Sequence, residues 1–148
     1  SYGVISWLGD LDKWGKIIAR YLKPGGHFVM VEFHPLVWML DEDLHTIKYP
    51  YSRKEPYIET GGTYTENGQE SISETVNWGY GIAEPVNAII RAGLQITGMD
   101  EYYYSPVNLF GDMEQTGEME YKLKGYKDIV PLLFSITARK DNKNENKV

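Results

Sequence analysis

The sequence predicts an α/β fold in which helices pack against a mixed β-sheet. Three observations support this prediction: an amphipathic helix over residues 11–22, a tight Pro-Gly-Gly turn directly after it, and an apolar strand over residues 27–34. A helix that returns the chain at once to a buried strand is the crossover unit of α/β proteins. The 148 residues are enough for one domain with its own core.

The first helix is indicated by apolar residues that recur every three or four positions. They are Leu11, Trp14, Ile17, Ile18, Tyr21 and Leu22. Asp10 stands at the N-cap position, and Pro24 with Gly25-Gly26 ends the helix, because proline lacks a donor and glycine accepts positive φ. Residues 28–31 are all apolar, as expected of a strand covered on both faces in a parallel sheet.

A long aromatic and polar region over residues 36–81 shows little helical periodicity. Within it, residues 63–65 and 72–78 alternate as half-buried antiparallel strands do. The dipeptide Asn67-Gly68 between them is the signature of a tight hairpin turn. We interpret this region as an inserted β-hairpin that forms a lid over the site.

A second helix is predicted to have Pro85 in its first turn and to end at Gly93, a residue type that terminates helices with positive φ. Two strands are predicted after it, at residues 94–104 and 132–138, so the domain extends over residues 1–138. The remaining residues, 139–148, are rich in Lys, Asn, Asp and Glu and are expected to form a disordered tail.

Composition narrows the partners and sites to be expected. The formal net charge of -6 argues against a nucleic-acid partner, because phosphate binding needs a basic surface. The absence of cysteine excludes disulfides, thiol catalysis and cysteine-based zinc sites. The sequence shows no secretory signal and no apolar run long enough to span a bilayer, so no membrane partner and a cytoplasmic location are expected.

The opening of the chain resembles the second half of a class I S-adenosylmethionine-dependent methyltransferase. Residues 1–11, the "LKPGG" turn at 22–26 and the strand exit at 32–35 carry the resemblance. It implies a partial Rossmann-like methyltransferase fold in which residues 1–6 are the stub of a strand and its exit loop. The family ends its sheet with an antiparallel strand pair, which the two late predicted strands match.

The family builds its cofactor site mainly from a Gly-rich turn after the first strand, and no such turn follows a strand in this sequence. The resemblance therefore implies the C-terminal, substrate-side part of an enzyme. In full length the enzyme would use S-adenosyl-L-methionine to methylate a small molecule, and this part alone is expected to be inactive. The alternative is a non-catalytic module with an aromatic-lined site that binds a ligand or forms a homodimer through an exposed sheet edge.

The candidate cofactor contacts are Ser1, Tyr2, Gly3 and Trp7. The resemblance places the first three in the loop that commonly touches the methionine part of the cofactor. Trp7 is a candidate to stack on the cofactor or the substrate. The alternative for all four is an ordinary connection between a strand and a helix, with Trp7 as a hydrophobic anchor for the helix start.

His34 is the candidate catalytic base, because it lies at the carboxyl end of a central strand and its ordinary pKa is near neutrality. Glu32 shares its face of a regular strand. The alternative is a histidine that bonds a loop backbone and fixes the turn. His27 is expected to be structural, His45 has no obvious partner, and no histidine spacing of the metal-binding kind is present, so no metal site is expected.

Aromatic residues are the candidate substrate contacts: Trp38, Tyr64, Trp78 and Tyr103. The first three belong to the predicted insert, where an aromatic lid would suit a flat or apolar small molecule. Tyr103 is the middle member of a tyrosine triplet whose side chains alternate between two faces. The alternative is cross-strand packing within a small hairpin, which explains most of the aromatic residues in the insert.

Overall fold

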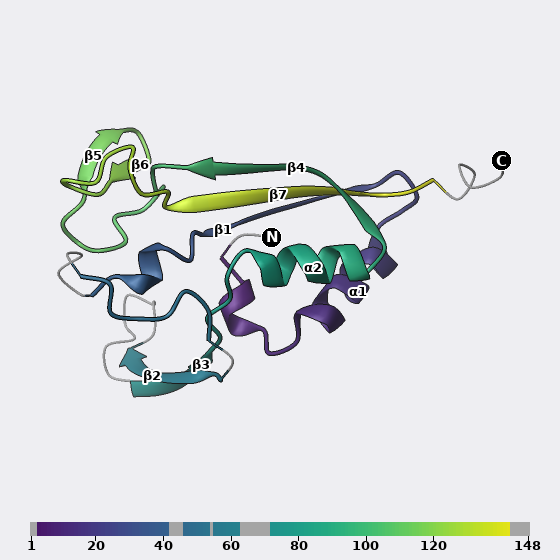
Figure 1. The fold of residues 1–148 in the computed structure, drawn as a ribbon, viewed down its shortest axis with the longest axis horizontal. Coiled ribbons are helices and arrows are strands. Elements are labelled where there is room, and N and C mark those ends of the chain that lie inside the picture. Colours follow the sequence, from purple (N-terminus) through teal and green to yellow (C-terminus); the bar gives the residue numbers. More distant parts are fainter. Residues whose placement is uncertain (1–2, 42–45, 54, 63–71, 143–148) are drawn as a thin grey trace.

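The computed structural model describes residues 3–41, 46–53, 55–62 and 72–142 of the chain. Its centre is a three-stranded sheet with two helices on one face (Figure 1). The strands are β1 (His27–Phe33), β4 (Leu94–Tyr102) and β7 (Leu133–Lys140), and the helices are α1 (Leu11–Tyr21) and α2 (Ala83–Arg91). This arrangement confirms the predicted α/β class.

Strand β7 lies between β1 and β4 and is antiparallel to both. The two outer strands therefore run in the same direction, and their carboxyl ends lie at the same end of the sheet. Phe134 in β7 is opposite Glu32 in β1 and opposite Glu101 in β4, so these three residues share one face. The prediction that the two late strands pair antiparallel in one sheet is confirmed.

The two helices begin and end as the sequence predicts, and they pack closely on each other. The Asp10 carboxylate caps α1 by accepting a hydrogen bond of 2.8 Å from the Lys13 backbone N–H. Gly93 ends α2 with a φ of +79°. Gly15 lets the helices approach closely, because a Cβ at this position would lie 2.8 Å from the carbonyl oxygen of Ala88 in α2.

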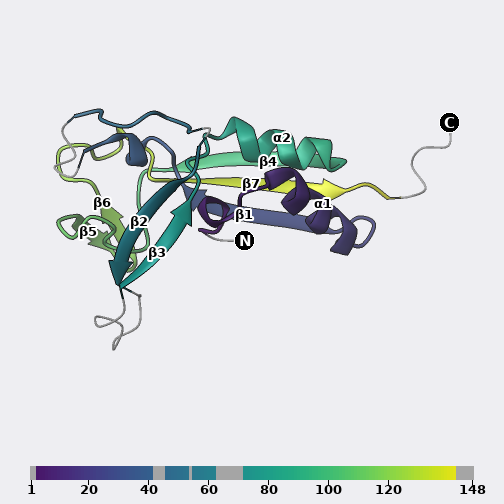
Figure 2. The same ribbon diagram turned by 90° about the horizontal axis from the view of Figure 1, so that it is seen from below.

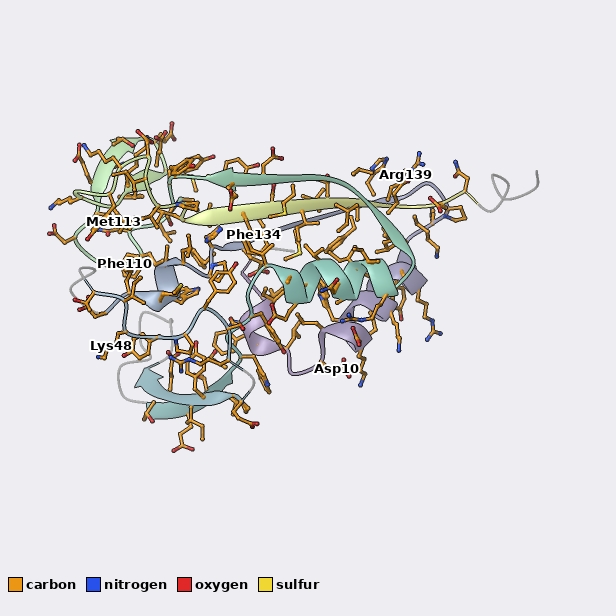
Figure 3. All side chains as sticks on the ribbon, in the orientation of Figure 1. Asp10, Lys48, Phe110, Met113, Phe134 and Arg139 are labelled. Atoms are coloured by element: carbon orange, nitrogen blue, oxygen red, sulfur yellow. The ribbon has the colours of Figure 1, made fainter. Side chains whose placement is uncertain are left out.

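The main hydrophobic core lies between the helices and the sheet. Met30 of β1, Ile136 of β7 and Ile89 of α2 are each 0% exposed. Burying a side chain of this size contributes about 1.5–3 kcal/mol relative to leaving it in water. Phe134 belongs to the same core and lies on the helix side of the sheet, near the carboxyl ends of the outer strands (Figure 3).

The prediction that the first strand is covered on both faces in a parallel sheet is wrong. Burial alternates along β1, with Phe28 and Met30 buried and Val29 52% exposed. The physical reason is that α1 and α2 both lie on one face of an antiparallel sheet, and such sheets commonly leave the other face to solvent. A wholly apolar run cannot by itself distinguish these two environments.

Two short hairpins flank the end of the sheet. One pairs β2 (Tyr57–Gly62) with β3 (Ile72–Asn77), and the other pairs β5 (Glu114–Gly117) with β6 (Glu120–Lys122). The predicted insert is thus a hairpin, and its second predicted strand is confirmed. Strand β2 was not predicted, and the predicted strand at residues 63–65 and the predicted Asn67-Gly68 turn lie outside the described part of the chain. The β5–β6 hairpin was not predicted.

A second, smaller core fixes these elements beside the sheet. Val37, Met113, Leu123 and Leu132 are buried together, and half-buried residues such as Phe110 pack around them. Val37 belongs to the short 3-10 helix η2 (Val37–Met39), which is the next element after β1. Phe110 and Met113 lie beyond Phe134, toward the end of the molecule that carries the β5–β6 hairpin (Figure 3).

The chain ends differ in part from expectation. The first described residues form a loop and the 3-10 helix η1 (Ile5–Trp7) beside β1, in keeping with an exit loop. Strand β7 continues to Lys140, so two residues of the predicted tail belong to the sheet: Arg139 is opposite both His27 and Gln95. Among the described residues, no helix has the length and apolar character required to cross a membrane.

Candidate functional site

The carboxyl ends of β1 and β4 form the candidate site. Both views show the β2–β3 hairpin, the β5–β6 hairpin and the long loops gathered at this end of the sheet, opposite the end at which β7 terminates (Figures 1 and 2). In open α/β sheets, ligands bind at the carboxyl ends of the strands. The polar side chains at the ends of β1 and β4 are therefore the first candidates for ligand contacts.

His34, the residue directly after β1, is 3% exposed and has both ring nitrogens engaged. Its Nδ1 accepts a hydrogen bond from the Leu36 backbone N–H at 3.2 Å, and its Nε2 lies 2.9 Å from Oε1 of Glu101. The ring meets Phe134 edge to face, with centroids 6.0 Å apart. The backbone of His34 donates to the carbonyl of Leu132 at 2.8 Å, which fixes the end of the strand.

The two hydrogen bonds define the tautomer of His34. A backbone N–H can only donate, so Nδ1 is the unprotonated nitrogen, and Nε2 carries the hydrogen that it donates to Glu101. Burial lowers the pKa of His34 below its ordinary value of 6.5, and the hydrogen bond and charge of Glu101 oppose this only in part. The Leu36 contact fits the turn-fixing alternative, and a role of His34 as a base stays a prediction.

Glu101 was not identified from the sequence and is the other half of this pair. It lies near the end of β4, and its side chain is 46% exposed, in contrast to the buried imidazole that contacts it. Of the ion pairs among the described residues, Glu101 takes part only in the one with His34. A charged residue late in a predicted strand was the available signal, but no local pattern specifies that this strand brings Glu101 within reach of His34.

Glu32 shares its face of β1 with His34, as predicted, but contacts a different segment. It is 4% exposed, and its Oε1 accepts a hydrogen bond of 2.9 Å from the Val4 backbone N–H. Burial raises the pKa of Glu32 above 4.5, although hydrogen bonds from the backbone of Val4 and Ile5 favour its charged form. Glu32 therefore ties the N-terminal loop to the carboxyl end of β1.

The candidate cofactor contacts that the structure describes lie in this loop. The Gly3 backbone N–H donates to the carbonyl of Val31 at 3.0 Å, which places it beside β1. Gly3 has a φ of +60°, and a Cβ there would meet no atom within 4 Å. Trp7, at the end of η1, is 49% exposed. Ser1 and Tyr2 lie outside the described residues.

Two of the candidate substrate contacts lie near the ends of the outer strands. Trp38 is in η2, is 49% exposed, and contacts Phe33 and Phe110 edge to face at 5.8 and 6.4 Å. Tyr103 directly follows β4 and is 39% exposed. The structure thus leaves part of both aromatic rings accessible on the segments that carry His34 and Glu101.

The other two candidates differ. Trp78 is half-buried, and its ring lies against Gly9, where an added Cβ would be 2.8 Å from the ring. Its backbone N–H donates to the carbonyl of Ser6 at 2.9 Å, so it connects β3 to the loop before α1. This contact lies outside the hairpin, so it is not the cross-strand packing of the alternative interpretation, and a role of Trp78 in substrate binding stays a prediction. Tyr64 lies outside the described residues.

A further aromatic cluster was not predicted as a unit. The Arg53 guanidinium lies over the rings of Tyr49 and Tyr57, with its carbon 5.0 and 4.5 Å from their centroids. The Arg53 backbone N–H donates to the carbonyl of Gly79 at 2.7 Å. The cluster therefore connects the first half of the insert to the segment that follows β3 at the end of the insert.

Among the described residues there is a further pocket, which involves none of the predicted site residues, and no metal-binding cluster. An open pocket between the start of α1 and α2 is lined by Gly9, Asp10, Leu11, Asp12, Tyr80, Glu84, Asn87 and Arg91, and none of the predicted site residues belongs to it. In the part of the chain that the structure describes, no group of three or more His, Asp or Glu residues is placed to hold a metal ion.

Comparison with known proteins gives matches in structure only. No protein-family model matches the chain, and no curated protein matches its sequence. A crystal structure of a protein from Listeria monocytogenes, described as an S-adenosylmethionine-dependent methyltransferase, matches 96% of this chain with a TM-score of 0.58 and 16% identity. A methyltransferase of the same description from Mesorhizobium loti matches 95% of it with a TM-score of 0.53 and 17% identity.

The chain spans 60% of the length of each of these two proteins. Their sequences are too different for the match to establish more than the fold. Within that limit, the resemblance stated from the sequence is confirmed: the chain has a partial Rossmann-like fold of the kind found in S-adenosylmethionine-dependent methyltransferases.

Proposed function

We propose that this chain is the substrate-side part of an S-adenosylmethionine-dependent methyltransferase that acts on a small molecule. The observation that carries the proposal is the sheet order β1-β7-β4 packed on two helices, together with the match of 96% of the chain to a methyltransferase structure. The likeness extends over nearly the whole chain, so the fold was not identified from one common motif. The polar pair His34–Glu101 then lies where an acceptor would bind.

The described residues fit one side of a cofactor site. Gly3 has open space beside it, Trp7 is half exposed, and Glu32 fixes the loop that carries them. We propose that Gly3 and Trp7, with Ser1 and Tyr2, contact S-adenosyl-L-methionine, which supplies an already activated methyl group. Such a reaction needs positioning above all, so the chain's own residues would hold the acceptor in line and keep water out.

The acceptor side is formed by the segments that follow β1 and β4. We propose that Trp38 and Tyr103 contact the acceptor through their accessible surfaces, together with Trp78 and with Tyr64, which lies outside the described residues. Aromatic walls with a few polar groups are typical of small-molecule sites. The hydrogen-bonded pair His34–Glu101 supplies polar groups on the same two segments.

The proposal predicts that catalysis needs more than these 148 residues, because the chain spans 60% of the length of the methyltransferases that it matches. The test is to incubate the natural protein that contains this chain with S-adenosylmethionine and pooled small molecules, and to detect S-adenosylhomocysteine and a product heavier by one methyl group. Formation of both supports the proposal. A protein that folds and converts none of a broad set of amines, phenols and acids contradicts it.

A second candidate function is self-association of the chain through its sheet. In the described structure, β1 and β4 are the outer strands of a three-stranded sheet, and β4 carries Met99 at 43% exposure. Outer strands offer backbone groups for pairing with another copy. Light scattering of the isolated chain tests this: a dimer supports an association module, and a monomer at high concentration contradicts it.

A further inference from the structure

We propose that Glu101 is the residue that binds the acceptor, that His34 is its positioning residue, and that the acceptor belongs to the amines. This assignment rests on the proposed function and adds the chemical class of the substrate. It exchanges the roles that the sequence suggests, in which His34 meets the substrate directly. The geometry of the pair carries the argument.

Accessibility separates the two side chains. The His34 imidazole is 3% exposed, whereas the Glu101 side chain is 46% exposed. A substrate that approaches the carboxyl ends of β1 and β4 from solvent can therefore reach the carboxylate but not the ring. The His34–Glu101 hydrogen bond uses Oε1 of the carboxylate, which leaves lone pairs of Glu101 for a second donor.

The hydrogen bonds of His34 give it the properties of a positioning residue. Its Nδ1 is committed to the Leu36 backbone N–H, and its Nε2 donates to Glu101. The imidazole cannot accept a proton at Nδ1 without breaking the bond to Leu36. Contact with the ring of Phe134 further restricts its orientation. A buried imidazole that is held in one orientation fixes the rotamer of the carboxylate to which it donates.

The surroundings of Glu101 match an amine better than an acid or a neutral apolar compound. Among the described residues, no Lys or Arg forms an ion pair with Glu101, so its charge is not already compensated by a cation. The next residue but one, Tyr103, exposes part of its ring, and Trp38 does the same after β1. A carboxylate is the group that binds a protonated nitrogen, and Glu101 can also take up the proton that this nitrogen must lose before it accepts a methyl group.

The test uses the 148-residue chain and two probes of the same shape. Benzylammonium carries the nitrogen that the proposal requires, and benzyl alcohol is its neutral counterpart. Both are titrated into 15N-labelled protein, and the shifts of the Glu101 and Tyr103 amide signals are followed. We expect benzylammonium to bind at these residues and Glu101→Gln to weaken it about fivefold, the effect of a partly exposed charged contact. The same substitution should change the affinity for benzyl alcohol by less than about twofold.

Two substitutions of His34 separate positioning from a purely structural role. The amide of His34→Asn can accept from Leu36 but is too short to reach Glu101, whereas His34→Gln reaches Glu101 and gives up the bond to Leu36. We expect His34→Gln to retain benzylammonium affinity within about twofold and His34→Asn to lose about as much as Glu101→Gln. A structural role alone predicts the reverse order, because the loop bond is kept only in the Asn variant.

These binding measurements decide the assignment without any assay of catalytic activity. If benzylammonium does not shift the Glu101 and Tyr103 signals, or if Glu101→Gln binds it as tightly as the wild type, the assignment is overturned. Equal effects of His34→Asn and His34→Gln overturn the positioning role. None of these measurements contains S-adenosylmethionine, so a negative result leaves the methyltransferase proposal to its own test.

Discussion

The side chains of His34 and Glu101 meet at 2.9 Å although the two residues are 67 positions apart in the sequence. His34 follows β1 and Glu101 belongs to β4, and these strands are separated by β7, so the contact crosses the middle strand over Phe134. The two partners differ sharply in burial, and this difference leads to distinct predictions for each.

Removal of each partner should cost a different amount of stability. His34→Ala should lower the free energy of unfolding by about 2–4 kcal/mol, because it leaves a cavity and deprives the half-buried Leu36 N–H of its acceptor. Glu101→Ala should lower it by less than about 1 kcal/mol, because the carboxylate is partly exposed. Urea unfolding measures both, with the exposed Glu118→Ala as a control. Equal losses for the two substitutions would show that the burial difference has no energetic consequence.

The pH dependence of stability should carry a contribution from His34. Its pKa is lowered by burial below the ordinary 6.5, so the unfolded chain binds a proton more readily than the folded protein. The stability that neutral His34 contributes is present above pH 6.5 and is lost as the pH falls through the folded pKa. The advantage of the wild type over His34→Gln in unfolding free energy should therefore shrink between pH 7.5 and more acidic values. An advantage that grows on acidification would mean that the folded protein favours the charged ring.

Glu32 should contribute to the pH dependence of stability with the opposite sign to that of His34. Burial raises its pKa above 4.5, so the folded protein holds this proton more tightly than the unfolded chain does. The associated stability is full below pH 4.5 and is lost as the pH rises through the folded pKa. Glu32→Gln keeps an acceptor for the Val4 N–H without the buried charge. Its stability relative to the wild type should rise with pH over this range in thermal unfolding, and a flat difference would contradict the shift.

Close contact between the helices should make Gly15 intolerant of a side chain. Gly15→Ala places a Cβ 2.8 Å from the carbonyl oxygen of Ala88 and 3.3 Å from Cβ of Ala92. We expect a loss of about 1–3 kcal/mol from the forced separation of α1 and α2, net of the gain of about 1 kcal/mol in helix propensity. The exposed neighbour Lys16→Ala should change the unfolding free energy by less than about 0.5 kcal/mol. A stabilised Gly15→Ala variant would show that the helices do not pack this closely.

Local sequence signals predicted the helices and the strands of the sheet well. The Asp10 cap, the Gly93 terminator and the apolar residues of α1 each act through nearby backbone, so their consequences can be read from short segments. The coverage of β1 could not be read this way, because an apolar run does not state whether one or two faces are covered. Strand β2 and the whole of the β5–β6 hairpin were missed because their sequences lack strong alternation or a recognisable turn.

The candidate site was predicted in part. His34 and Glu32 were found because both lie at the end of one strand, and strand ends are known ligand positions. Glu101 was missed because its importance depends on the pairing of β1 and β4 with β7, which no local pattern specifies. Trp78 was predicted as a substrate contact, and the structure places its ring against Gly9 in the loop before α1. Its prediction as a substrate contact remains to be tested.

The most direct test of the account is a calorimetric titration with S-adenosylhomocysteine, performed on the natural protein that contains this chain and on the 148-residue chain alone. The account predicts one-to-one binding to the natural protein, weaker in its Trp7→Ala variant, and weak or no binding to the isolated chain. Absence of binding to the folded natural protein would contradict the methyltransferase proposal. Micromolar binding to the isolated chain would contradict the view that it is only the substrate-side part.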